Sequence, residues 1–126
     1  MKQVVASSPH FLVKDVVAAG DYYQDKLGFM IPQYWGDPPT FAMPHRDNFI
    51  VMLNQVAGLA PHPNGDSEVW DAYFWCTGVD ELFDEFRASG ANIFNEPVDR
   101  ELYGMREFAV RDYDGYLLVF AENIET

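Results

Sequence analysis

Residues 16–28, VVAAGDYYQDKLG, and residues 79–90, VDELFDEFRASG, carry the pattern that decides the fold. In both stretches apolar side chains recur at offsets of three and four, which is the spacing of one face of an α-helix. A glycine closes each stretch, as is common where a helix ends. The two stretches therefore predict two helices of similar length, about half of the chain apart.

Short runs of bulky apolar residues surround each helix in the same order. One run precedes the helix and three follow it, with Gly, Pro and Asp in the gaps, so the sequence predicts two βαβββ modules, about 8–54 and about 70–122. The Gly- and Pro-rich stretch 55–68 is the predicted connector. The expected strands are 8–14, 30–35, 40–45 and 48–54 in the first module, and 69–76, 91–94, 104–111 and 116–122 in the second.

The whole chain, residues 1–126, is predicted to form one α+β domain. Each module has one helix to cover one face of a four-stranded sheet. The opposite face must therefore be buried by the sister sheet, by a partner chain or by a ligand. Two curled sheets with a cavity between them are the expected result.

The charge of the chain excludes some classes of partner. Lys and Arg number 8 against 20 Asp and Glu, which gives a formal net charge of -12. A surface of this sign repels phosphates, so nucleic acids and anionic membranes are not expected partners. It would attract a cationic small molecule, although an acidic surface also serves solubility alone.

Cysteine content and hydropathy bear on the compartment. Cys76 is the single cysteine, so the chain cannot form an intramolecular disulfide, and a cytoplasmic location is the expectation. No segment approaches the roughly 20 consecutive apolar residues that a membrane-spanning helix needs, and the first residues do not resemble a signal peptide.

Three stretches, in the same order along the chain, resemble one protein family. The stretches 11–29, 78–86 and 103–122, read FLVKDVVAAGDYYQDKLGF, GVDELFDEF and YGMREFAVRDYDGYLLVFAE, are similar to the glyoxalase, bleomycin-resistance and extradiol-dioxygenase superfamily, also called the vicinal oxygen chelate fold. The resemblance is strongest to the bleomycin-resistance binding proteins. It implies a homodimer of paired βαβββ modules with two grooves at the subunit interface. In the resembled proteins the N-terminal segment crosses to the partner chain, and Pro9 would suit such a hinge.

Many members of this superfamily hold a divalent metal on four inward-facing strand positions, and the resemblance places those positions here. The first falls on Ser8 and the last on Val119. The middle positions fall within 51–53 and 72–74, where Tyr73 alone has a side-chain oxygen. Serine and tyrosine are poor ligands for divalent metals and valine is none, so we assign no metal ligand, no cofactor and no catalytic residue.

Aromatic residues supply most of the candidate ligand contacts. The resemblance carries ligand contact onto Phe41, Tyr73 and Tyr103, the last of which replaces a Trp. Trp35 and Trp75 join them because flat rings stack on heteroaromatic or cationic ligands.

Two titratable residues complete the candidate set. Strand alternation places His10 on the inner face together with Ser8, and the simplest interpretation of His10 is a histidine that lines the cavity. Glu107 is a carboxylate that could pair with a cationic ligand, but an Arg–carboxylate pair across the sheet is the alternative for this strand.

The sequence therefore predicts metal-independent binding and sequestration of a small, aromatic or cationic, antibiotic-type compound resembling bleomycin. A metal-dependent lyase, isomerase or dioxygenase of the same superfamily is the alternative, with ligands that include His10, Tyr73 and Glu107. An accessory protein that meets another protein through its acidic surface is a third hypothesis.

Overall fold

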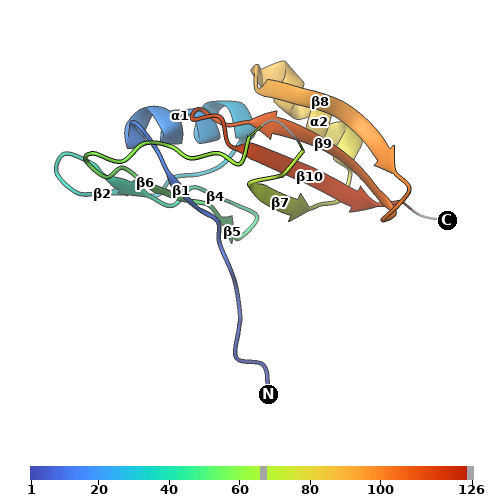
Figure 1. The fold of residues 1–126 in the computed structure, drawn as a ribbon, viewed down its shortest axis with the longest axis horizontal. Coiled ribbons are helices and arrows are strands. Elements are labelled where there is room, and N and C mark those ends of the chain that lie inside the picture. The colour runs from blue at the N-terminus through green and yellow to red at the C-terminus, as the bar shows by residue number, and fades with distance from the viewer. Residues whose placement is uncertain (66–67, 125–126) are drawn as a thin grey trace.

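The computed structural model describes residues 1–65 and 68–124, which contain two four-stranded sheets, one two-stranded sheet and two helices. Figure 1 shows how these elements are arranged. The first half contains β1 (His10–Leu12), α1 (Val16–Leu27), β2 (Tyr34–Trp35), β3 (Phe41–Ala42), β4 (His45–Arg46), β5 (Phe49–Ile50) and β6 (Met52–Asn54). The second half contains β7 (Ala72–Trp75), α2 (Val79–Ser89), β8 (Asn92–Arg100), β9 (Met105–Arg111) and β10 (Leu117–Asn123).

The two sheets have the same topology. Their strand orders are β1-β6-β3-β2 and β7-β10-β9-β8. In each sheet the first strand of the module pairs in parallel with its last strand, and the remaining pairs are antiparallel. The prediction of an α+β fold with two βαβββ modules is confirmed.

The bounds of the predicted strands differ from those in the structure; the expected strand 30–35, for example, is reduced to Tyr34–Trp35. The expected strands 40–45 and 48–54 are each divided, because a β4–β5 hairpin forms around Asp47 and Asn48, which both have positive φ angles. The expected strand 91–94 is too short, since β8 continues to Arg100. Pro97 lies where the β8–β9 register shifts, and proline is tolerated at such a bulge in an edge strand.

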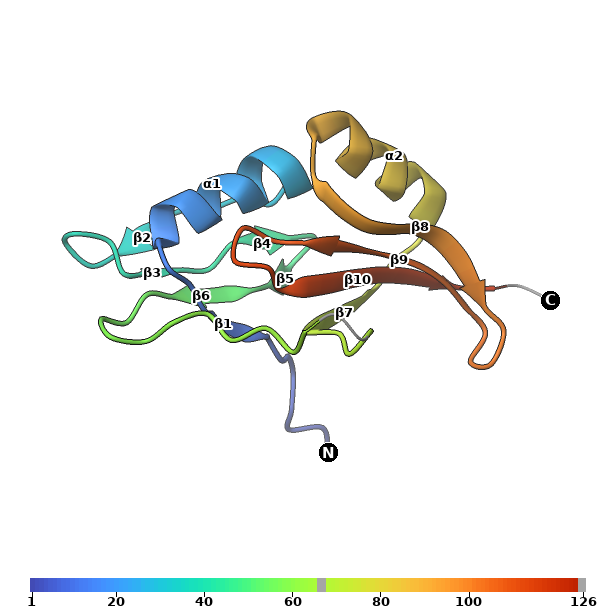
Figure 2. The same cartoon turned by 45° about the horizontal axis from the view of Figure 1, so that its top comes forward.

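Both helices pack on the same side of the sheets, as Figure 2 shows. Alternate strand residues point toward them. Phe74 and Phe120 stack against each other within the main core, whereas Tyr73 and Val119 belong to a smaller cluster on the opposite face. We call this opposite side the open face of each sheet.

The helix ends follow the expected chemistry. Asp15 caps α1, because its Oδ1 accepts hydrogen bonds from the backbone N–H groups of Val17 and Ala18 at 3.1 Å each. Gly28 ends α1 with a φ of 68°, a conformation that costs other residues more than glycine. No helix in the described part of the chain is long and apolar enough to cross a membrane.

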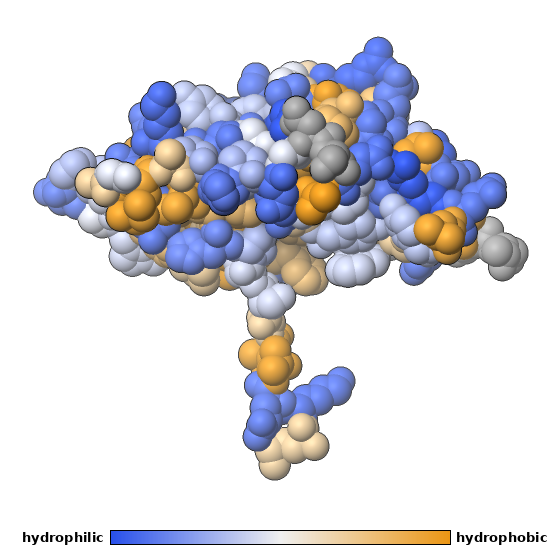
Figure 3. All heavy atoms as spheres, viewed as in Figure 1, coloured by the Kyte–Doolittle hydropathy of each residue, from blue (hydrophilic) through white to orange (hydrophobic). Residues whose placement is uncertain are grey.

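The N-terminal segment extends away from the rest of the molecule, as Figures 1 and 3 show. Val4 and Val5 are exposed within it. Pro9 precedes β1 and accepts a hydrogen bond on its carbonyl oxygen from the N–H of Met52, at 2.9 Å. The expected exchange of this segment with a partner chain remains a prediction.

Asp112 is a buried carboxyl group with a structural role in the turn before β10. Its Oδ1 accepts hydrogen bonds from the N–H groups of Asp114 and Tyr116, at 3.0 and 2.9 Å, and its Oδ2 accepts one from the Tyr23 hydroxyl at 2.7 Å. Burial raises the pKa of Asp112 from 3.8 to about 7.

This pKa predicts how stability depends on pH. The folded protein holds the Asp112 proton more tightly than the unfolded chain does. The contribution of Asp112 to the free energy of unfolding is therefore largest below about pH 4 and decreases as the pH rises to about 7. The decrease is at most ~1.4 kcal/mol per pH unit. Urea denaturation of the wild type and Asp112→Asn across this range measures the effect. We expect the wild type to lose stability relative to the variant as pH rises; parallel curves would contradict the assignment.

Candidate functional site

A fully buried carboxylate lies on the open face of the second sheet. Glu107, on β9, is 1% exposed. Its Oε2 accepts a hydrogen bond from the Tyr73 hydroxyl at 2.6 Å, and its Oε1 accepts one from the Tyr103 hydroxyl at 2.6 Å and one from Arg100 Nε at 3.0 Å. We call these four residues the Glu107 cluster.

The topology of the second sheet brings the cluster together. β7 contributes Tyr73, the end of β8 contributes Arg100, and the turn between β8 and β9 contributes Tyr103. Glu107 lies opposite Ala121 in the β9–β10 pair, and Tyr73 lies opposite Val119 in the β7–β10 pair. Because Val119 and Ala121 of β10 have small side chains, the Tyr73 and Glu107 side chains can meet above them.

The phenols of the cluster are hydrogen-bond donors at neutral pH. Loss of hydration, followed by the hydrogen bonds to Glu107, raises the pKa of Tyr73 above its usual value and the pKa of Tyr103 to about 12. Both groups therefore stay protonated and donate hydrogen bonds to the Glu107 carboxylate. Neither tyrosine is suited to act as a general base.

Cross-strand pairing of Arg and carboxylate is confirmed, with partners that the sequence does not reveal. Arg100 binds Glu107 and also contacts Glu68, with 3.3 Å between Nη2 and Oε1. Arg106 instead pairs with Asp99 and Asp80, at 3.0 Å each. Glu107 is thus bound by the arginine at the end of β8, not by its neighbour along β9.

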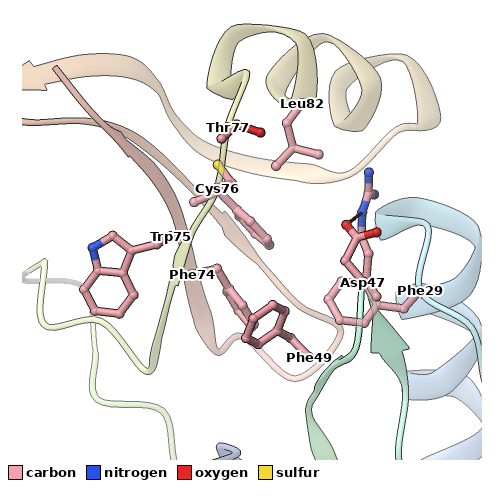
Figure 4. A pocket seen from close by; sticks show the side chains of 10 residues that line it. Phe29, Asp47, Phe49, Phe74, Trp75, Cys76, Thr77 and Leu82 are labelled. Atoms are coloured by element: carbon pink, nitrogen blue, oxygen red, sulfur yellow. Dashed lines mark ion pairs between the residues drawn. The ribbon is translucent and has the colours of Figure 1, made fainter. Parts of the chain in front are cut away.

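A cleft of about 310 Å³ lies at the junction of the two modules (Figure 4). Leu82 reaches it from α2, Asp47 from the β4–β5 turn, and Trp75 from β7. We call it the junction cleft; its lining residues are Phe29, Arg46, Asp47, Phe49, Phe74, Trp75, Cys76, Thr77, Leu82 and Phe120.

Trp75 connects the junction cleft to the Glu107 cluster. Its indole is 4.9 Å from the Tyr73 ring, centroid to centroid, and the residue is 71% exposed. Across the cleft, Phe49 is 64% exposed. A second cavity, of about 500 Å³, lies along residues 55–61 and Val13, and its lining contains none of the predicted ligand-binding residues.

The remaining predicted residues form a second group, on the open face of the first sheet. The ring of Phe41 lies 6.1 Å from that of His10 and 5.7 Å from that of Trp35. The structure thus brings Tyr73, Trp75, Tyr103 and Glu107 together on one sheet and His10, Trp35 and Phe41 on the other. Their role in ligand binding remains a prediction.

The metal positions of the resembled family do not carry a suitable set of donors here. The Ser8 hydroxyl donates a hydrogen bond to the carbonyl oxygen of Ile50 at 2.7 Å. Val119 is buried in the apolar cluster, and the Tyr73 hydroxyl is committed to Glu107. Among residues 1–65 and 68–124, no three His, Cys, Asp or Glu side chains are grouped so that they could hold a metal ion. These residues do not fit a divalent metal.

A family model confirms the relationship that the motifs indicate. The model of the glyoxalase/bleomycin resistance protein/dioxygenase superfamily matches residues 5–120. The chain belongs to this superfamily.

Solved structures share the glyoxalase-superfamily fold of this chain. TioX from Micromonospora sp. ML1 is 22% identical with a TM-score of 0.75, covering 96% of this chain and 100% of that one. A glyoxalase/bleomycin resistance protein/dioxygenase from Nocardioides is 18% identical with a TM-score of 0.73, covering 99% and 87%. A glyoxalase-related enzyme from Clostridium phytofermentans is 17% identical with a TM-score of 0.71, covering 98% of each chain. No curated protein matches the sequence.

Sequence reasoning missed two parts of this site. Arg100 and Glu68 were not candidates, because the expected strand ended at residue 94 and neither residue lies in a motif. The turn expected between the strands 40–45 and 48–54 is the β4–β5 hairpin, but the contribution of Phe49 to the junction cleft was not predicted.

Proposed function

We propose that this protein binds and sequesters a small aromatic compound of the antibiotic type, similar to bleomycin, without a metal ion. The observation that carries the proposal is the gathering of Tyr73, Trp75 and Tyr103 around a buried carboxylate, with Trp75 also lining the junction cleft. Exposed aromatic rings, here Trp75 and Tyr103, offer stacking surfaces, each worth about 0.5 to 1.5 kcal/mol to a planar ligand.

The proposal includes a homodimer in which the ligand lies between subunits. Each open face carries aromatic residues, with Trp35 and Trp75 at 41% and 71% exposure. Both helices lie on the other side of the sheets. A second copy placed against these faces would oppose the first sheet of one chain to the second sheet of the other and create two equivalent grooves.

The test is a thermal-shift titration with metal-free bleomycin and, in parallel, with Zn²⁺, Ni²⁺, Mn²⁺ and Fe²⁺, with EDTA as control. A ligand that binds the folded state raises the Tm as its concentration exceeds Kd. We expect bleomycin to stabilise the protein and the metals to leave the Tm unchanged. Stabilisation by one metal, reversed by EDTA, would favour the metal-dependent enzyme instead.

A matched pair of tyrosine variants locates the binding surface. Tyr103 and Tyr113 are 51% and 53% exposed, and Tyr113 lies in the turn before β10, away from the cluster. Tyr103→Ala is expected to weaken bleomycin binding about tenfold, and Tyr113→Ala to leave it unchanged. Equal effects of the two variants would refute this site, and a monomer in light scattering at saturating ligand would refute the interfacial grooves.

A further inference from the structure

The buried Glu107 carboxylate does not hold the backbone in place. Asp112, the other carboxyl group that is buried among the described residues, accepts hydrogen bonds from two backbone N–H groups of its turn. Every hydrogen bond that we identify at Glu107 comes from a side chain at the edge of the open face. Met105, Ala109 and Val119 surround it with apolar surface. Because a buried charge costs several kcal/mol before it is compensated, an apolar residue would serve this sheet as well.

The cation that compensates Glu107 is held weakly. Arg100 donates to the carboxylate through Nε alone, whereas Arg and carboxylate frequently form two parallel hydrogen bonds. Its Nη2 contacts Glu68, whose side chain is 53% exposed. Arg100 is also the last residue of an edge strand, directly before a turn. Its guanidinium can therefore move into solvent without breaking the sheet.

The local charge favours a second cation over an anion. Glu68 and Glu107 supply two negative charges and Arg100 supplies one positive charge, so this group of residues keeps a net charge of −1. The chain as a whole carries −12. Rings of Tyr73 and Tyr103 stand on the two sides of the carboxylate, and their faces attract cations.

We propose that Glu107 recognises a cationic nitrogen-donor group of the ligand, of the amidinium or guanidinium type, and that Arg100 occupies the place of this group in the empty protein. The inference rests on the proposed function and adds the chemical class of the ligand's polar group. On binding, the ligand cation donates hydrogen bonds to the Glu107 carboxylate while Arg100 turns toward Glu68 and solvent. Trp75 and Tyr73 then stack on the aromatic part of the same ligand.

Benzamidine is the simplest probe, because it joins an amidinium to an aromatic ring, and benzamide is its neutral analogue. Isothermal titration calorimetry of the full chain should give saturable binding of benzamidine and at least tenfold weaker binding of benzamide. Glu107→Gln is expected to weaken benzamidine binding at least tenfold. Glu96→Gln, which removes an exposed charge from β8, is the matched control and should bind like the wild type.

The arginine variants test the exchange itself. Arg100→Gln removes the competing cation and should bind benzamidine several-fold more tightly than the wild type. Arg106→Gln removes the same charge from an arginine that pairs with Asp80 and Asp99, and should leave binding unchanged. If Arg100→Gln does not fold, Arg100→Lys provides the measurement, because a lysine has no planar guanidinium and should compete less well.

The outcomes separate this inference from the proposed function. Equal binding of benzamidine and benzamide, or undiminished binding to Glu107→Gln, would overturn the recognition by Glu107. Unchanged binding to the Arg100 variants would overturn the exchange. If bleomycin still binds the wild type and Glu107→Gln equally well, the proposed function stands and the inference fails. If bleomycin does not bind the wild type, the proposed function fails by itself.

Discussion

Replacing Phe108 with alanine is expected to lower the free energy of unfolding by about 3 to 5 kcal/mol, a large part of the stability of a domain of this size. Phe108 is fully buried on β9. Its ring lies 5.4 Å from Phe83 and 5.8 Å from Phe86, both on α2, and 5.7 Å from Phe120 on β10. The substitution removes the ring that joins the helix to the sheet and leaves a cavity.

Urea denaturation measures this loss, with Leu102→Ala as the control. Leu102 is 97% exposed in the turn between β8 and β9, so its removal should change the free energy of unfolding by no more than about 0.5 kcal/mol. Similar losses for the two variants would show that α2 does not depend on this aromatic contact. Phe108 directly follows Glu107 on β9 and points to the opposite face, so its packing supports the strand that carries Glu107.

The main core could be predicted from periodicity because helix and strand spacing determine which residues share a face. Val79, Phe83 and Phe86 are buried on α2 as the spacing indicates, and Leu82 packs partly against the same core. Phe11 and Val13 point toward the helices, while His10 is exposed on the other face, as strand alternation requires. These positions depend on local geometry, which the sequence encodes directly.

The site was harder to predict because Arg100 reaches Glu107 only when β8 continues past Pro97. Pro97 is a poor strand residue, so the pattern ended the strand at residue 94. In the structure the proline is accommodated where the register with β9 shifts, and the strand continues to Arg100. Motif and composition therefore made Glu107 and Tyr73 candidates, but they did not indicate Arg100, which contacts both Glu107 and Glu68.

Removing Arg100 alone is expected to destabilise the protein more than removing Arg100 and Glu107 together. Arg100→Met leaves the buried Glu107 carboxylate with two phenol donors and no cation, which should cost about 2 to 3 kcal/mol. In the double variant Arg100→Met, Glu107→Met, the apolar side chains extend the cluster of Met105, Ala109 and Val119. We expect that variant to lie within about 1 kcal/mol of the wild type or to exceed it.

Urea denaturation of the wild type, both single variants and the double variant gives the coupling energy between the two residues. A double variant as stable as the wild type would mean that apolar residues stabilise the fold as well as the ion pair does. The carboxylate would then have to be explained by what it binds, and benzamidine should raise the Tm of Arg100→Met more than that of the wild type, because it supplies the missing cation. A double variant weaker by several kcal/mol would instead make the cluster a structural element, and Glu107 recognition would lose its energetic basis.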